Sequence, residues 1–318
     1  MIRLGDSEED LQRAADLLRR GELVAVPTET VYGLAGVADE PEAVRAIFAA
    51  KGRPADHPLI VHLPGIEAMD DWAAEVPETA RKLARAFWPG PLTLILPKAD
   101  RVSDIVTGGQ QTVGLRVPGH PVTLRLLKIL DRAVAAPSAN RFGRISPTAA
   151  DHVVSEFEGR DSVAAVIDGG PCNVGVESTI VDCSGPYPRV LRPGMISIEQ
   201  LAGVLGDTPN LAGESEGPRA SGRLPSHYAP ETKVELVDAE VLVRPDPDAA
   251  VLALGDTPDP GGFRAWQSLP EDPKLYARGL YAALRQLDHR GARRILVQRL
   301  PEESAWSAIR DRLDRATS

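Results

Sequence analysis

The 318-residue sequence predicts an α/β protein with a mixed main sheet, joined by a linker to a smaller α/β unit. Apolar runs typical of strands alternate with segments of helical spacing over about the first 200 residues, which is the pattern of α/β proteins. Strand-like stretches without an intervening helix occur near residues 92–117 and 164–192, so the sheet should not be purely parallel. The composition changes at Gly206, and we therefore expect a catalytic domain, a linker and a C-terminal domain at residues 1–205, 206–232 and 233–318.

The composition is that of an ordinary globular protein, with 43% apolar and 25% charged residues. A net charge of -9 argues against a surface built for non-specific nucleic-acid binding, although a local basic pocket remains compatible with it. The two cysteines, Cys172 and Cys183, have the spacing of neither a zinc knuckle nor a redox pair. Residues 1–16 are charged and amphipathic, unlike a signal peptide, and no apolar run is long enough for a bilayer. We therefore expect a cytoplasmic protein without a membrane partner.

The first elements lead to a polar loop. Ser7 begins a capping-box-like sequence before a helix that Gly21 closes. A short buried strand at 23–26 then runs into residues 27–34 (PTETVYGL), where polar side chains follow a strand end. This stretch is either a Thr-rich strand edge or a site, and the framing proline and glycine favour a site on a rigid scaffold.

The next helix carries an apolar stripe at Val44, Ile47 and Phe48 and ends near Lys51. Lys51 and Arg53 flank a glycine that allows close approach of a ligand, and a strand follows at 59–63. Cations on a rigid loop suit a polyphosphate. The alternative is that both cations only complement the dipole at the C-terminus of the helix.

A third helix starts at Pro77 and stops at residues 88–91 (WPGP), before a strand at 92–96. A polar turn at 108–112 precedes a strand that contains Arg116 among apolar residues. A charge in such a place needs a partner. The partner is either a carboxylate of the protein, in a buried ion pair, or a ligand carboxylate held by the guanidinium fork.

The pattern continues with a helix at 120–130 and a strand at 134–136 that breaks into residues 137–140 (PSAN). Small residues and hydroxyls there and at 146–148 are typical of anion-binding turns, but the same residues also make ordinary turns. Strands are expected at 163–167, around 177–182 and at 190–192, before a short helix that Ser197 caps.

Residues 207–223 are rich in Gly, Pro, Ser and Glu and have no apolar period, so they are predicted to be a linker. Residues 226–230 (SHYAP) differ, because an imidazole and a phenol on an irregular segment favour docking over solvation. Strands at 234–237, 251–254 and 295–297 and helices at 275–287 and 306–313 then predict a small doubly wound unit. It contains no Gly-x-Gly-x-x-Gly, so we assign it no dinucleotide.

Seven motifs occur in the order found in the threonylcarbamoyl-AMP synthase family, whose catalytic unit is a YrdC-type domain. They are PTETVYGL (27–34), KGRP (51–54), HPL (57–59), WPGPLT (88–93), RVP (116–118), APSAN (136–140) and ESTIVD (177–182). The resemblance covers about the first 200 residues, and HYAP (227–230) with the C-terminal unit is similar to the longer, two-domain members. It implies a YrdC-type twisted mixed sheet linked to a small Rossmann-like domain.

The resemblance also implies a nucleotidyltransferase that makes threonylcarbamoyl-AMP and pyrophosphate from L-threonine, bicarbonate and ATP. Mg²⁺ would arrive with ATP, because no dense carboxylate cluster suggests a metal site of the protein itself. The product would pass to a threonylcarbamoyl transferase that modifies tRNA.

By the same resemblance, Lys51 and Arg53 bind phosphates in the reaction. The remaining predicted ATP-binding residues are His57, Thr112, Ser138, Ser146, Arg192 and, on the folded-back linker, Tyr228. The predicted threonine pocket consists of Thr30, His62, Arg116, the backbone at Ala136, and Ser178. Position 57 departs from the family, in which many members carry Asn, and a phosphate contact from an imidazole would depend on pH.

Two other functions compete with this one. YrdC-type carbamoyltransferases carry an acylphosphatase unit or cysteine clusters, for which 318 residues and two unclustered cysteines leave no room. A double-stranded RNA-binding module would use a basic concave face, and the net charge of -9 makes that a poor primary function. A weak RNA contact through a basic cavity stays open.

Overall fold

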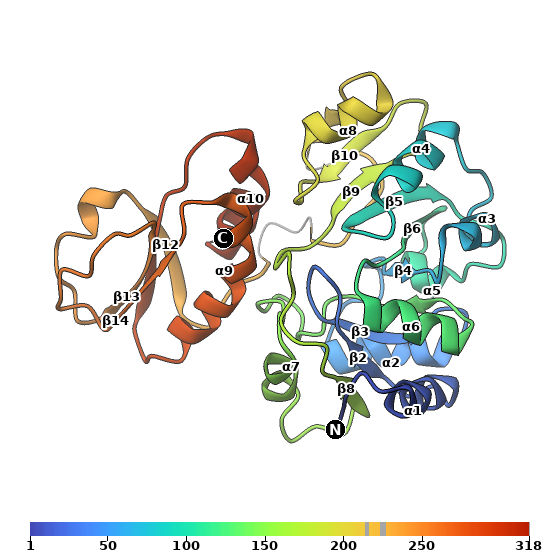
Figure 1. Cartoon of the computed structure of the whole chain (residues 1–318), viewed down its shortest axis with the longest axis horizontal. Coiled ribbons are helices and arrows are strands. Elements are labelled where there is room, and N and C mark those ends of the chain that lie inside the picture. Colours follow the sequence, from blue (N-terminus) through green and yellow to red (C-terminus); the bar gives the residue numbers. More distant parts are fainter. Residues whose placement is uncertain (214–215, 223–226, 318) are drawn as a thin grey trace.

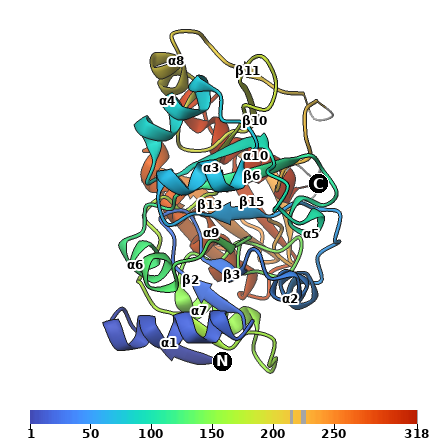
Figure 2. The ribbon, with the colours of Figure 1, turned by 90° about the vertical axis from the view of Figure 1, so that its right-hand side faces the viewer.

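The computed structural model describes residues 1–213, 216–222 and 227–317. It contains a larger N-terminal unit and a smaller C-terminal unit, which lie side by side (Figure 1). Viewed at right angles, the C-terminal unit (orange and red) lies behind the sheet of the larger unit (Figure 2). The predicted α/β class with a mixed sheet is confirmed.

The larger unit is built on one twisted sheet. Its strands are β1 (Ile2–Leu4), β2 (Val24–Val26), β3 (Gly33–Val37), β4 (Ile60–His62), β5 (Leu92–Pro97), β6 (Thr112–Arg116), β7 (Val134–Ala135), β8 (Ala165–Ile167), β9 (Thr179–Asp182), β10 (Arg189–Arg192) and β11 (Asn210–Leu211). Their order is β1-β8-β2-β3-β7-β4-β6-β5-β9-β10-β11. The sheet contains both parallel pairs, such as β4 with β6, and antiparallel pairs, such as β5 with β6, so it is mixed.

Helices cover both faces of this sheet. They are α1 (Glu8–Arg19), α2 (Pro41–Lys51), α3 (Met69–Trp72), α4 (Glu78–Phe87), α5 (Asp104–Thr107), α6 (Pro121–Leu130), α7 (Ala150–Glu156) and α8 (Ile198–Leu205). Side chains of β3 alternate between two apolar clusters: Leu34 packs with residues of α2 and α4, and Ala35 packs with residues of α1 and α6. A strand buried on both faces in this way explains the continuous apolar runs in the sequence.

The C-terminal unit has a parallel sheet of order β12-β15-β13-β14. Its elements are β12 (Lys233–Val237), β13 (Ala249–Leu254), β14 (Ala265–Leu269), α9 (Pro273–Asp288), β15 (Arg294–Gln298) and α10 (Ser307–Ala316). Asp272 caps α9 by accepting a hydrogen bond from the backbone of Leu275, and a proline occupies the first turn. Within the described part of the chain, no helix is long and apolar enough to cross a bilayer.

Short elements account for most differences from the sequence prediction. Strands β1, β3 and β14 and helix α7 were not expected, because three to seven residues carry little periodicity. Within the stretch predicted to be a linker, Asn210–Leu211 form a short strand that pairs in parallel with β10. The open edge of β10 offers unpaired backbone groups, and pairing with them needs no side-chain pattern.

The two units share an apolar cluster that packs against the loops of the main sheet. Val31 and Val176 of the larger unit belong to the same buried cluster as Tyr276 and Leu280 of α9. Gly175 has φ +85, and a Cβ there would lie 2.4 Å from the carbonyl oxygen of Ala277 on α9. Only a glycine therefore permits this approach, and α9 is in direct contact with the backbone that leads into β9.

Candidate active site

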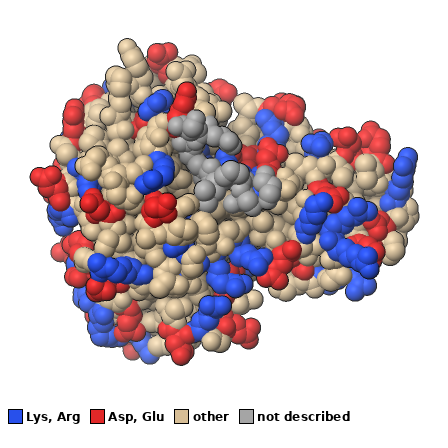
Figure 3. All heavy atoms as spheres, turned by 180° about the vertical axis from the view of Figure 1, so that it is seen from behind, with Lys and Arg blue, Asp and Glu red and all other residues tan. Residues whose placement is uncertain are grey.

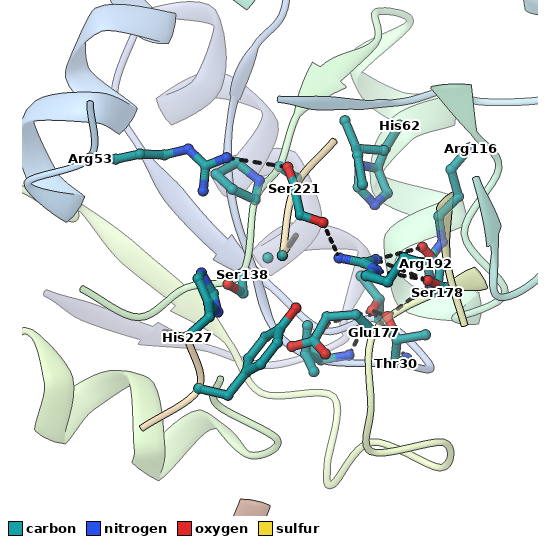
Figure 4. Close-up of a pocket in the computed structure, with 18 residues that line it drawn as sticks. Thr30, Arg53, His62, Arg116, Ser138, Glu177, Ser178, Arg192, Ser221 and His227 are labelled. Atoms are coloured by element: carbon teal, nitrogen blue, oxygen red, sulfur yellow. Dashed lines mark hydrogen bonds between the residues drawn. The ribbon is translucent and has the colours of Figure 1, made fainter. Parts of the chain in front are cut away.

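A cavity lies between the strand ends and loops of the main sheet and residues 221–222 and 227–228. Its wall combines the loop after β2, the strands β4 and β6, the turn after β7, and the ends of β9 and β10. Figure 4 shows the side chains that converge on this central cavity.

Arg53 enters the cavity directly after α2. Gly52 ends that helix in the left-handed conformation, with φ 61, and turns the chain so that Arg53 is buried. Its Nη2 donates to the carbonyl of Pro58 (3.0 Å) and to Ser221 Oγ (3.2 Å). Burial lowers the pKa of Arg53 to about 10, so the guanidinium remains charged at neutral pH. Its Nε has no hydrogen-bond partner in the described structure, which leaves a donor for an anion.

Arg192 reaches the cavity wall from the end of β10. Its Nε and Nη2 donate to the carbonyl of Ser178 at 3.2 and 2.9 Å, and its Nη1 donates to the carbonyl of Ser221 at 2.8 Å. This one side chain therefore ties β9 and β10 to the segment that covers the cavity. Arg53 and Arg192 both contact Ser221, which brings two cations to the same side of the wall.

Arg116 projects from β6 and forms the buried ion pair that was one of its two predicted roles. Its Nη2 lies 2.6 Å from Glu29 Oε1 and 3.0 Å from Thr30 Oγ1. The other carboxylate oxygen of Glu29 accepts the backbone N–H of Gly119. Arg116 also lines the cavity, and its Nε has no partner among the described atoms. Arg116 can therefore keep its ion pair with Glu29 through Nη2 and bind a ligand carboxylate through Nε.

Lys51 lies behind the cavity wall. Its Nζ donates to the carbonyls of Ser138 (2.5 Å) and Asn140, and the side chain is fully buried. Burial, followed by the charge of Arg53, lowers the pKa of Lys51 well below its ordinary value. The ammonium braces the turn at 137–140 from behind, and a direct phosphate contact by Lys51 stays a prediction.

The structure brings most of the predicted residues together. All five predicted threonine residues line the central cavity, and so do four of the predicted ATP residues: Arg53, Ser138, Arg192 and Tyr228. His57, Thr112 and Ser146 do not belong to its lining. Ser146 is buried and donates to Glu177 Oε1 at 2.6 Å. Their roles toward a nucleotide stay predictions.

Glu177 is a cavity residue that the sequence reasoning did not single out. It is buried at the start of β9, next to Ser178, and it lines the wall. The argument that identified Arg116, a charge within an apolar strand, would also have identified Glu177 in ESTIVD. The sequence contained no signal for Ser221 and Gly222, which lie in the predicted linker.

His227 and Tyr228, the first described residues after Gly222, pack over the cavity. His227 lies against Tyr228 with ring centroids 4.1 Å apart, and Tyr228 stacks on Tyr281 of α9 at 5.9 Å. The Tyr228 hydroxyl passes so close to Gly222 that a Cβ there would lie 2.0 Å from it. The Tyr228 hydroxyl has no hydrogen-bond partner in the described residues. Ser226, part of the same predicted segment, lies outside the described residues, and closure over a nucleotide stays a prediction.

His57 is expected to contribute little to ATP binding near neutral pH. Its ring meets Phe142 edge-on, with centroids 5.3 Å apart, and burial followed by the charge of Arg53 lowers its pKa below the ordinary 6.5. The imidazole is therefore neutral above pH 6.5 and supplies no charge to a phosphate there. His57→Asn should keep the KM for ATP within about twofold at pH 7.5.

The measurement is the KM for ATP of both proteins from pH 6 to 9. Above pH 6.5, the ATP affinity of the parent should not fall through loss of a proton from His57. The lowered pKa means that His57 has already lost this proton at more acidic pH. A KM that rises about tenfold between pH 6.5 and 8 in the parent but not in His57→Asn would contradict this expectation.

Comparison with known protein families gives a consistent result along the whole chain. Residues 16–194 match the Sua5, YciO and YrdC family, which is described as "Telomere recombination". Residues 196–318 match the family described as "Threonylcarbamoyl-AMP synthase, C-terminal domain". The chain belongs to the threonylcarbamoyl-AMP synthase family.

Curated members of the threonylcarbamoyl-AMP synthase family align over almost the full length. The synthase of Pyrococcus abyssi is 40% identical over 98% of this chain and 94% of its own length. The synthase of Bacillus subtilis is 38% identical over the same shares of the two chains. A crystal structure of P. abyssi Sua5 with L-threonine superimposes with a TM-score of 0.90 at 37% identity, covering 99% of this chain and 97% of that one.

More distant structures share the fold of the larger unit only. HypF in its phosphate- and nucleotide-bound form has a TM-score of 0.51 at 18% identity, over 59% of this chain and 30% of its own. At that identity the likeness concerns the fold, so the two-domain synthases remain the informative relatives.

Proposed function

We propose that this chain is a nucleotidyltransferase that makes threonylcarbamoyl-AMP and pyrophosphate from L-threonine, bicarbonate and ATP. The proposal rests on one observation: guanidinium groups stand at different points around the wall of a single cavity. In Figure 4, Arg53 and Arg116 lie on opposite sides of the cavity, and Arg192 lies between them. Such an arrangement suits a small carboxylate at one end and a polyphosphate at the other.

The end around Arg116 suits threonine. Arg116 Nε is free among the described atoms to meet a carboxylate, and Thr30 and Ser178 offer hydroxyls nearby. Burial, with a smaller effect of Arg116, lowers the pKa of His62 to about 3, so its imidazole is neutral near pH 7. A neutral ring does not repel the ammonium of an amino acid, and it can accept a hydrogen bond from the substrate amine or hydroxyl.

The end around Arg53 and Arg192 suits the phosphates of ATP. In the proposed reaction the threonine nitrogen binds the bicarbonate carbon with loss of water, and a carbamate oxygen then attacks the α-phosphorus and releases pyrophosphate. Negative charge develops on the phosphate oxygens, where fixed cations act most strongly. No protein nucleophile is needed. The thiols of Cys172 and Cys183 have pKa values raised by burial to about 12, which argues against thiolate chemistry.

Mg²⁺ fits this site only as a companion of the nucleotide. Glu177, at the wall, already accepts three hydrogen bonds, and Glu29 is engaged by Arg116 and the Gly119 backbone. Across the described ranges, no group of three or more His, Cys, Asp or Glu side chains could hold a metal ion. Mg²⁺ would therefore keep water and phosphate oxygens as ligands.

His227 and Tyr228 would protect the product from water. A carbamoyl–phosphate anhydride hydrolyses in water, and the buried side chains of Tyr228 and His227 line the cavity in which it would form. Burial raises the pKa of Tyr228 and lowers that of His227 to about 3, so both groups are neutral near pH 7. Exclusion of water by neutral groups suits a reactive intermediate.

In this proposal the product passes to a tRNA-modifying threonylcarbamoyl transferase in the cytoplasm. The surface gives no separate support to RNA binding as the main function. Basic and acidic side chains are interspersed over the face in Figure 3, so no field of one sign covers it.

Threonine-dependent pyrophosphate release tests the function. Purified protein with ATP, Mg²⁺, L-threonine and bicarbonate should release pyrophosphate, and omission of threonine should abolish most of the release. The product should be identified as threonylcarbamoyl-AMP by mass spectrometry. Equal release without threonine would refute the assignment. Release that requires carbamoyl phosphate in place of threonine and bicarbonate would instead favour the carbamoyltransferase reaction.

A further inference from the structure

The carboxylate of Glu177 connects the central cavity to the C-terminal unit. It accepts hydrogen bonds from Ser146 Oγ (2.6 Å), Tyr281 OH (2.9 Å) and Arg312 Nε (2.8 Å). Tyr281 belongs to α9 and Arg312 to α10, so two of these three donors come from the other unit. Burial alone would raise the pKa of Glu177, but Arg312 and Arg192 outweigh it and hold the pKa below the ordinary value. Glu177 is therefore an ionised acceptor with its oxygens engaged, unsuited to act as a base.

Arg312 contacts three segments that carry cavity residues. It bonds Glu177, it donates through Nη2 to the carbonyl of Pro193 at 3.0 Å, and its guanidinium lies 5.3 Å from the ring centroid of Tyr228. Pro193 directly follows Arg192. The side chain of Arg312 is fully buried, and it does not itself line the cavity. The guanidinium of Arg312 thus contacts Glu177 just before β9, Pro193 just after β10, and Tyr228.

We propose that Arg312 is a positioning residue of the synthase, through which the C-terminal unit completes the active site. It holds Ser178 through Glu177, Arg192 through Pro193, and Tyr228 through its ring. The planar fork is required, because a lysine ammonium cannot contact the carboxylate, the carbonyl and the ring face together. This inference rests on the proposed function for its kinetic test. The alternative is that Arg312 only neutralises the buried Glu177.

Arg312→Lys separates the two explanations, because it keeps the charge beside Glu177 and loses the fork. The kcat of threonine-dependent pyrophosphate release should fall at least about tenfold, while the KM values for ATP and threonine change by less than about threefold, since Arg312 touches neither substrate. Without any ligand, trypsin should cut within residues 207–222 several-fold faster than in the parent, since a lysine ammonium held by Glu177 no longer contacts the ring face of Tyr228.

Arg310→Met on the same helix is the matched control. Arg310 donates to the carbonyls of Pro301 and Glu303 within its own unit, so this variant should keep the parental kcat and cleavage rate. An Arg312→Lys protein with parental kcat and parental cleavage would overturn the proposal. The same holds if Arg310→Met loses as much activity as Arg312→Lys, because the effect would then not belong to the contacts of Arg312.

A second variant keeps the test valid if Arg312→Lys folds poorly. Arg312→Met/Glu177→Gln removes both buried charges together, and its thermal midpoint should lie closer to the parent than that of Arg312→Met. If the double variant regains stability and stays slow, the positioning role is supported. If it regains the parental kcat, Arg312 acted only as a counter-charge, and the proposal fails. A parent without threonine-dependent release would refute the proposed function, and the ligand-free cleavage comparison would still decide the role of Arg312.

Discussion

Arg116→Lys is expected to raise the KM for threonine by one to two orders of magnitude and the KM for ATP much less. The lysine keeps a positive charge near Glu29, so the buried carboxylate retains a partner. It lacks the planar fork that can serve Glu29 and a ligand carboxylate at the same time. Loss of one charged hydrogen bond costs about 1.5–3 kcal/mol, which corresponds to about a tenfold to hundredfold change in affinity.

Steady-state kinetics with each substrate varied in turn measures this difference. Arg189→Lys is a suitable control, because Arg189 also lies on a strand and pairs with Asp182 at 2.8 Å, but it is outside the central cavity. It should leave both KM values close to those of the parent. If Arg116→Lys raises the two KM values equally, Arg116 serves the ion pair with Glu29 and does not hold threonine.

Arg53→Gln is expected to weaken ATP binding by one to two orders of magnitude. Arg53 is buried in the cavity wall with an Nε that has no partner in the described structure, so a phosphate would gain a charged hydrogen bond there. The loss of such a bond costs about 1.5–3 kcal/mol. Glutamine retains the aliphatic stem and a polar end group, which limits rearrangement of the loop.

Calorimetric titration with ATP at constant ionic strength is the measurement, because charged contacts respond to salt. Arg45→Gln provides the control on the preceding helix α2, since Arg45 is exposed and pairs only with Glu42 among the interactions of the described structure. Unchanged ATP affinity in Arg53→Gln would return Arg53 to the alternative of a cation at a helix end.

Lys51→Met adds a comparison: loss of thermal stability with unchanged ATP affinity would assign Lys51 to bracing the turn at 137–140.

Local sequence patterns predicted the longer elements well. The caps at Ser7 and Ser197 stand where the sequence placed them and α2 ends at Lys51 as predicted, because helix ends depend on backbone groups within one helical turn. The strands β11 and β14 were missed, because edge pairing and a strand with a half-exposed face leave no clear period. The predicted boundaries of the domains and the linker stay predictions.

The amino-acid sequence by itself predicted a set of residues that line one cavity together, because those residues stand in ordered motifs at strand ends. The tertiary structure alone decided how their charges are paired. Arg116 meets Glu29 across 87 positions, and Arg312 meets Glu177 across 135 positions. Lys51 turned out to face two carbonyls behind the wall. Partners this far apart in the chain leave no local pattern, because only the packing of the sheet and of the C-terminal helices brings their side chains together.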